Sequence, residues 1–148
     1  MLNEIERLRQ VSQRCLAGKP LGRDLANWLG AALKSYLSRQ HRTVEEALGL
    51  RFAQGGVPWW REEAIRKRNA ALRELAGRFF SGLSPGAQAQ RIWTLATRYA
   101  AAAWRFDHGG GGMPGSYRGT AKECLWRAFA SGAAMPIGRR QLRNILGR

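Results

Sequence analysis

The spacing of apolar residues restricts the fold of this chain more than any other feature. Between residues 22 and 40, apolar side chains recur every three or four positions over about four turns, at Leu25, Trp28, Leu29, Ala32, Leu33, Tyr36 and Leu37. This period places them on one face of an α-helix, whereas a half-buried strand alternates apolar and polar residues. No strand-like alternation persists anywhere in the 148 residues. The sequence therefore predicts an all-α protein.

Capping residues and helix breakers divide the rest of the chain into further helices. We expect helices over 2–17, 22–40, 43–48, 59–80, 85–107 and 120–131, and a last short helix from residue 138. Two pairs, Thr43 with Glu46 and Thr120 with Glu123, have the spacing of a capping box, in which each side chain accepts a hydrogen bond from the backbone near the other. The Ser-Pro pair at 84–85 is typical of a helix start, and we predict one unbroken helix from there to residue 107.

Four consecutive glycines at 109–112 mark the best candidate for a boundary, because glycine has the greatest backbone freedom. We predict a compact bundle of about four to five helices over 1–108, a flexible linker over 109–118 and a C-terminal helical hairpin over 119–148. The hairpin either stands apart or packs on the bundle as one domain. The glycines lack the lysine of a P-loop and the spacing of a dinucleotide-binding turn, so they do not indicate a phosphate loop.

Most aromatic residues fall on the apolar faces of these helices, and we expect them in the core: Trp28, Tyr36, Trp60, Phe79, Tyr99, Trp126 and Phe129. Two aromatics around the loop at 50–58 are different. Phe52 and Trp59 lie close in sequence to Arg51 and Arg61, so one interpretation is stacking on a base or on a partner protein. The alternative is a hydrophobic staple that closes the start of the following helix.

The charge of the chain points to its partners. Twenty-five Lys and Arg against ten Asp and Glu give a formal net charge of +15. So large an excess repels itself in a compact state, which indicates a polyanionic partner such as nucleic acid, an acidic membrane surface or an acidic protein. Most of the cations are arginine, which binds phosphate in a bidentate fashion. Arginine, alanine and glycine are also favoured by the codons of a GC-rich genome, such as that of a bacterium or a mobile element, but codon usage does not explain the surplus of cations over anions.

The excess is densest after the glycine run, where residues 109–148 carry seven cations against the single Glu123. A helix, a turn and a second, arginine-rich helix have the outline of a DNA-binding helix-turn-helix. On the second helix, the apolar face predicts that Arg139, Arg140 and Arg143 point outward. A plain helical hairpin is the alternative, because the turn is longer than is usual for the motif.

A second basic feature lies on the helix expected over 85–107. Arg91, Arg98 and Arg105 recur every seven residues, a spacing that drifts by only about 20° per repeat on a helix. The three side chains then form one stripe that could follow a phosphate backbone. An ordinary solvated helix face is the alternative.

The sequence offers little material for catalysis or metal binding. The two histidines, His41 and His108, fall in loops or at helix ends, and Cys15 and Cys124 have neither metal-ligand nor disulfide-framework spacing. We therefore expect no metal, no cofactor and no enzymatic activity. No apolar run approaches the roughly 18 residues of a membrane span. The acidic start of the chain predicts no signal peptide, and we expect a cytoplasmic protein without a membrane partner.

These features favour a small, basic, helical protein that binds nucleic acid, with DNA favoured over RNA because of the helix-turn-helix outline. The residues expected to bind it are Arg91, Arg98, Arg105, Arg118, Lys122, Arg139, Arg140 and Arg143. The alternative function is that of an interaction protein, either a helical subunit of a larger nucleoprotein complex or an adaptor or inhibitor that docks on an acidic protein. Exposed aromatics such as Phe52, Trp59 and Phe106 suit that alternative.

Overall fold

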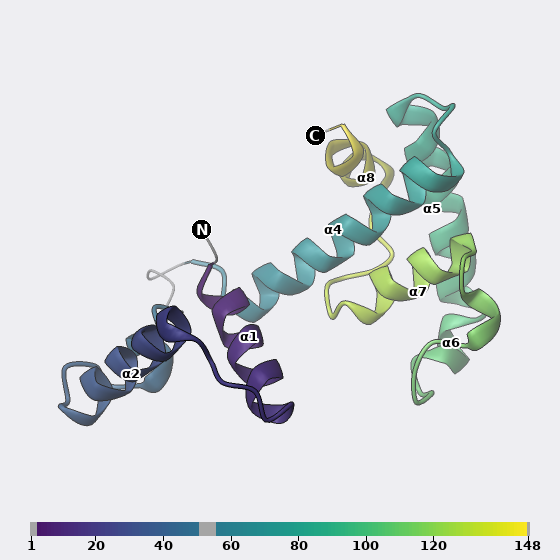
Figure 1. Ribbon diagram of the computed structural model, residues 1–148. Helices are drawn as coiled ribbons and strands as arrows, with labels where there is room; N and C mark the ends of the chain where they lie inside the picture. The colour runs from purple at the N-terminus through teal and green to yellow at the C-terminus, as the bar shows by residue number, and fades with distance from the viewer. Residues whose placement is uncertain (1–2, 51–55, 148) are drawn as a thin grey trace. The chain divides into compact units, whose positions relative to one another are not determined.

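The computed structural model describes residues 3–50 and 56–147. Within these residues the regular structure consists of eight α-helices and one 3-10 turn, with no strand, which confirms the predicted all-α class. The chain forms two compact units that divide between Trp59 and Trp60. Figure 1 shows the helices that belong to each unit.

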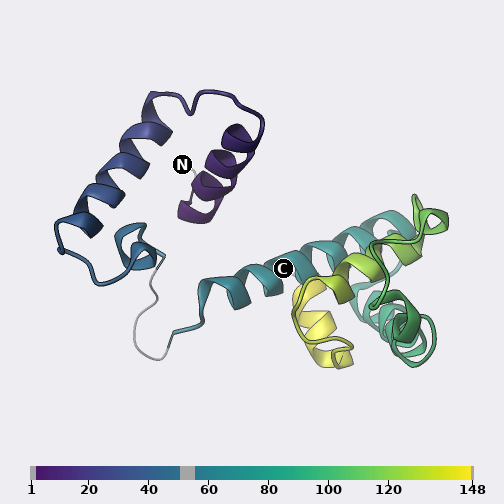
Figure 2. The same cartoon turned by 90° about the horizontal axis from the view of Figure 1, so that it is seen from below.

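The first unit contains α1 (Glu4–Leu16), α2 (Arg23–Leu37) and α3 (Val44–Ala47). Figure 2 shows α1 and α2 joined by the loop at 17–22. The unit has a small core in which Ala32, Leu48 and Leu50 are buried. The capping box predicted for α3 is confirmed, because Thr43 Oγ1 accepts a hydrogen bond from the Glu46 N–H at 3.1 Å. The Glu46 carboxylate in turn accepts from the N–H of Arg42, one residue before the cap, at 3.1 Å.

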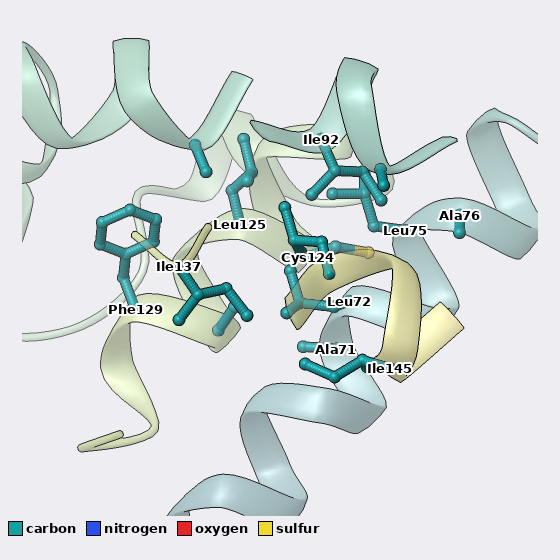
Figure 3. Close-up of a cluster of buried hydrophobic side chains, with 14 of the residues drawn as sticks. Ala71, Leu72, Leu75, Ala76, Ile92, Cys124, Leu125, Phe129, Ile137 and Ile145 are labelled. Carbon is teal, nitrogen blue, oxygen red and sulfur yellow. The ribbon is translucent and has the colours of Figure 1, made fainter. Parts of the chain in front are cut away.

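The second unit contains most of the helical structure. Its elements are α4 (Trp59–Phe79, which starts at the division), α5 (Pro85–Ala101), α6 (Trp104–Asp107), the 3-10 turn η1 (Gly115–Tyr117), α7 (Ala121–Ala130) and α8 (Arg139–Leu146). Buried side chains from α4, α5, α7 and α8 form one core (Figure 3). The largest fully buried side chains are Leu72, Leu75, Ile92, Cys124 and Leu142.

The glycine run at 109–112 lies inside this second unit. Ile92 comes before the run and Leu142 after it, and both belong to the same buried cluster. The C-terminal helices therefore share a core with α4 and α5. The flexibility expected for 109–118 stays a prediction.

The long helix predicted over 85–107 is interrupted, which corrects the expectation of one continuous helix. α5 ends at Ala101, and Ala102 leaves helical geometry with φ −121° and ψ −88°; α6 then starts at Trp104. The break brings Asp107 back to α5, where its carboxylate accepts a hydrogen bond from the Tyr99 hydroxyl at 2.7 Å. On an unbroken helix these two residues would be separated by about 12 Å along the axis. The break is therefore what allows this hydrogen bond to form.

Three of the aromatics expected in the core are exposed instead. Tyr36 and Phe79 are each 37% exposed, and Trp60 is 52% exposed. On α4 the fully buried residues begin only at Arg68, so Trp60 lies on a part of the helix that is at most partly buried. At the other end the helix stops at Phe79, and the next residue, Phe80, packs against the core in its place. Tyr99 and Phe129 are buried as predicted, and Trp28 and Trp126 are partly buried.

The second predicted capping box forms only in part. Thr120 precedes α7, but its hydroxyl donates to the Tyr117 carbonyl at 2.6 Å instead of accepting from the helix. The carboxylate of Glu123 does accept a backbone N–H, that of Gly119, at 2.8 Å. The 3-10 turn immediately before α7 offers the hydroxyl a nearby carbonyl, and this competes with capping.

One buried cation connects α4 to the segment between α7 and α8. Arg68 is 4% exposed, and its guanidinium donates to the Ala134 carbonyl at 3.2 Å and to the Asn69 side-chain oxygen at 3.0 and 3.1 Å. Burial lowers the pKa of this guanidinium. The hydrogen bond to Ala134 holds the 131–138 connection, which precedes α8, against α4.

Candidate nucleic-acid interface

The candidate interface is built on the packing of α8 against α5. The inner face of α8 carries Leu142 and Ile145, which are buried in the same cluster as Ala89 and Ile92 of α5. Because helical side chains repeat every 3.6 residues, this docking turns the other face of α8 toward solvent. Arg139, Arg140 and Arg143 lie there and are exposed, as the sequence predicted.

A groove of about 310 Å³ runs between the two helices. It is lined by Gly86, Ala89 and Gln90 of α5 and by Arg139, Arg140 and Arg143 of α8. One guanidinium is held in place: Arg139 Nη1 donates to Gln90 Oε1 at 3.0 Å, and its Cζ lies 5.0 Å from the centre of the Trp93 ring. A Cβ added at Gly86 would meet nothing within 4 Å, so the groove is open at this point.

Arg91 and Arg98 extend the basic surface along α5. Both are exposed, and their seven-residue spacing corresponds to about 10 Å along the helix axis. Arg91 follows Gln90 directly, about 100° further around the helix, so it lies next to the residue that holds Arg139. We call the five arginines Arg91, Arg98, Arg139, Arg140 and Arg143 the α5–α8 basic surface.

The charge of this surface has no local compensation. The sequence contains no Asp or Glu over 75–106 or over 124–148, so neither α5 nor α8 carries a carboxylate. Within the described residues, none of the five arginines forms an ion pair. A net charge summed over a long segment does not show these two acid-free runs. The runs can nevertheless be read directly from the sequence, and they point to α5 and α8 as the helices with uncompensated charge.

Three arginines elsewhere in the second unit, Arg66, Arg78 and Arg127, are paired with carboxylates. Glu74 accepts from Arg127 at 2.8 Å and from Arg78 at 3.0 Å, and Arg66 lies 4.0 Å from Glu62. The hydrogen bonds from Arg127 and Arg78 lower the pKa of Glu74, and Glu74 in turn raises the pKa of Arg127. These three arginines carry compensated charge, whereas the five of the α5–α8 basic surface do not.

Three other residues predicted to bind nucleic acid lie away from this groove. Arg105 is on α6, so it does not continue the helical stripe of Arg91 and Arg98. Arg118 is exposed just after η1, and the amine of Lys122 lies 5.3 Å from the centre of the Tyr117 ring. All three follow the C-terminal end of α5, whereas the groove is at the N-terminal half of that helix.

The two aromatics proposed for stacking are not brought to the surface together. Phe52 lies outside the described residues. Trp59 is partly buried against the small core of the first unit, and its indole N–H donates to the Glu45 carboxylate at 2.5 Å. The position of Trp59 therefore favours a structural role over base stacking.

The C-terminal helices do not reproduce the compact turn of a helix-turn-helix. The connection between α7 and α8 covers 131–138, whereas the motif uses a turn of about three or four residues. In addition, α8 packs on α5. The helix-turn-helix interpretation stays a prediction.

A second polar cluster surrounds Asp107. One oxygen, Oδ2, accepts from the hydroxyls of Tyr99 and Tyr117, each at 2.7 Å. Burial, followed by the hydrogen bond to Asp107, raises the pKa of Tyr99; the hydrogen bond to Asp107 is the largest cause that raises the pKa of Tyr117. The cluster connects α5 and α6 to η1. Its hydrogen bond between Asp107 and Tyr117 therefore joins the two ends of the segment that contains the glycine run.

This cluster predicts a loss of stability at alkaline pH. The folded state holds the two phenolic protons more tightly than the unfolded state does. Their contribution to the free energy of unfolding is therefore complete below the ordinary tyrosine pKa of 10.0 and is lost as the pH rises above it. We expect the melting temperature to fall above about pH 10, and to fall less steeply in Tyr99→Phe. Circular dichroism melts across this range measure the slope, with Tyr36→Phe, outside the cluster, as the control. Equal slopes for all three proteins would contradict the prediction.

Comparisons with known proteins give no relative: no family model, no curated protein and no solved structure matches this chain significantly. Among residues 3–50 and 56–147, no group of three or more His, Cys, Asp and Glu side chains is placed to hold a metal ion. In the same residues no helix combines the length and the apolar character needed to cross a membrane.

Proposed function

We propose that this chain binds nucleic acid through the α5–α8 basic surface, with DNA as the first candidate polymer and RNA as the second. The observation that supports the proposal is the set of five exposed arginines on two packed helices that carry no carboxylate. A protein that neutralises phosphates with arginine gains affinity from the release of counterions, whatever the base sequence. No chemical step on the nucleic acid is part of the proposal.

The groove supplies the positions at which phosphates would bind. Gln90 and Trp93 hold Arg139, so less side-chain freedom is lost when this guanidinium binds a phosphate. Arg140 and Arg143 line the same groove, and each planar guanidinium can donate two parallel hydrogen bonds to phosphate oxygens. Arg91 and Arg98 offer two further guanidiniums along α5.

The test removes two of these cations. In Arg139→Ala/Arg140→Ala we expect the affinity for a labelled DNA of arbitrary sequence to fall about tenfold. We also expect the slope of log K against log salt concentration to become shallower by about 0.9 for each phosphate that the variant no longer binds. Fluorescence anisotropy at several salt concentrations measures both quantities.

The control removes the same net charge from elsewhere. Arg9→Ala/Arg66→Ala also deletes two cations, but in the folded protein these lie beside Glu6 and Glu62. We expect this variant to keep the salt slope of the wild type. If both double variants lose affinity and slope equally, binding follows net charge and not this surface. If the wild-type chain binds neither DNA nor RNA, the proposal is wrong.

A protein–protein role is the second candidate, and one observation favours it. Three apolar residues on α2 are exposed, with Leu33 at 40%, Tyr36 at 37% and Leu37 at 77%, and Phe106 on α6 is 81% exposed. Clustered apolar and aromatic side chains are typical of interfaces with another protein. Binding of nucleic acid only in the presence of a partner protein would favour this function.

A further inference from the structure

We infer that the α5–α8 basic surface takes single-stranded nucleic acid, with unpaired bases stacking beside the arginines. The inference rests on the proposed function and specifies its substrate class. Two pairs of an arginine and an aromatic ring at the N-terminal half of α5 carry it, and a third pair lies at the C-terminal end of α4. The distances from Cζ to the ring centre are 5.0 Å for Arg139 and Trp93, 5.8 Å for Arg91 and Phe80, and 5.2 Å for Arg78 and Phe79.

Two of the pairs, Arg91 with Phe80 and Arg139 with Trp93, form one band across α5, and Phe79 precedes Phe80 at the α4 end of this band. On one side, Gln88 Nε2 donates to the Phe80 carbonyl at 2.9 Å and fixes the end of α4 against α5. On the other side, Gln90 accepts from Arg139 of α8. With about 100° between successive residues, Arg91 points between Gln88 and Gln90. The band therefore continues from the end of α4, over the exposed face of α5, to the groove beside α8.

A surface that only tracks a duplex backbone does not require aromatic rings. Phosphate binding needs only cations, whereas here each of three guanidiniums also lies beside an aromatic ring. Unpaired bases stack on aromatic side chains and on guanidinium planes, and both surfaces are present in the band. In an intact duplex the base faces are hidden in the stack, so these rings would add little to its binding.

The surrounding residues leave room for bases. Phe79 is 37% exposed, Trp93 is partly exposed, and the groove beside α8 is open at Gly86. The acid-free run over 75–106 includes both rings and Arg91, and the carboxylate of Glu74 just before the run is paired with Arg78 and Arg127. Aromatic rings interleaved with arginines, inside a region without acidic residues, are the chemistry of a surface that binds single strands.

The experiment compares three labelled oligonucleotides of equal length and at equal salt concentration: single-stranded DNA, single-stranded RNA and blunt duplex DNA. For the full wild-type chain we expect at least about tenfold tighter binding to a single strand than to the duplex. Tighter binding to either single strand supports the inference, and the two single-strand arms show which polymer is preferred. Tightest binding to the duplex overturns it.

The variant Phe79→Ala tests the stacking contribution directly. Because base–aromatic stacking contributes about 1–3 kcal/mol per base, we expect at least about a fivefold loss of single-strand affinity, with unchanged salt slope and unchanged duplex affinity. Phe106→Ala removes another exposed phenylalanine, on α6, and serves as the matched control that keeps wild-type affinity. Trp93→Leu, checked for folding by circular dichroism, is expected to lower single-strand affinity in the same way.

The two proposals fail in different ways. If Arg139→Ala/Arg140→Ala weakens binding while Phe79→Ala and Trp93→Leu do not, the basic surface binds nucleic acid but the rings do not stack on bases, and the single-strand inference is wrong. If none of the three oligonucleotides binds to the wild-type chain, the proposed function itself fails.

Discussion

Replacing Leu142 by alanine is expected to lower the free energy of unfolding of the second unit by about 2–5 kcal/mol. Leu142 is fully buried, and it belongs to the cluster that joins α8 to α4, α5 and α7. Truncation removes apolar packing and leaves a cavity among closely packed helices, which cannot collapse fully around the missing atoms. Urea denaturation followed by helical circular dichroism measures the loss.

The same substitution is expected to weaken nucleic-acid binding, because Leu142 anchors the helix that carries Arg139, Arg140 and Arg143. Gln141→Ala is the control, since Gln141 is exposed on the same helix and its loss should change stability by no more than about 0.5 kcal/mol. If Leu142→Ala and Gln141→Ala unfold at the same urea concentration, the docking of α8 on α5 through Leu142 is wrong.

Replacing Asp107 by alanine is the second large effect, an expected loss of about 2–4 kcal/mol in the free energy of unfolding. Hydrogen bonds to a charged acceptor contribute about 1.5–3 kcal/mol each, and Asp107 accepts two. The loss is dominated by Tyr99, whose buried hydroxyl is left without an acceptor, whereas Tyr117 is partly exposed and regains a bond to water. Chemical denaturation of the variant and the wild type measures the difference.

A double-mutant cycle with Tyr99→Phe isolates the interaction. If the hydrogen bond accounts for the effect, Asp107→Ala should cost clearly less in the Tyr99→Phe background than in the wild type. Asp24→Ala, which removes an exposed aspartate from the first turn of α2, controls for the loss of a negative charge. Additive effects of Asp107→Ala and Tyr99→Phe would count against the network.

Much of the local structure could be predicted from the sequence because it depends on neighbouring residues. The capping box of Thr43 and Glu46 forms, and Ser84 caps α5 by accepting from the Ala87 N–H at 3.3 Å. The break after Ala101 could not be predicted, because nothing near Ala102 in the sequence stops a helix. The break accompanies the hydrogen-bonded cluster of Tyr99, Asp107 and Tyr117, which only the folded chain brings together.

The candidate site was predictable in part. The apolar face of α8 placed its three arginines outward, and the seven-residue spacing placed Arg91 and Arg98 on one face of α5. The predicted position of Arg105, the third member of that stripe, is wrong because α5 ends before this residue. Which arginines pair with the carboxylates outside the acid-free runs could not be inferred from sequence, since the ion pair of Arg127 with Glu74 joins α7 to α4 across more than fifty residues.

By itself, the sequence determined the helical class, most helix starts, the outward direction of the α8 arginines and the positive charge, because periodicity, capping and composition act over one or two turns. Only the tertiary structure decided that α8 packs on α5, and that Gln90 therefore meets Arg139, 49 positions further along the chain. The groove and the Arg–aromatic band exist because buried side chains such as Leu142 and Ile92 find one common core, and burial of apolar surface has no preference for sequence neighbours.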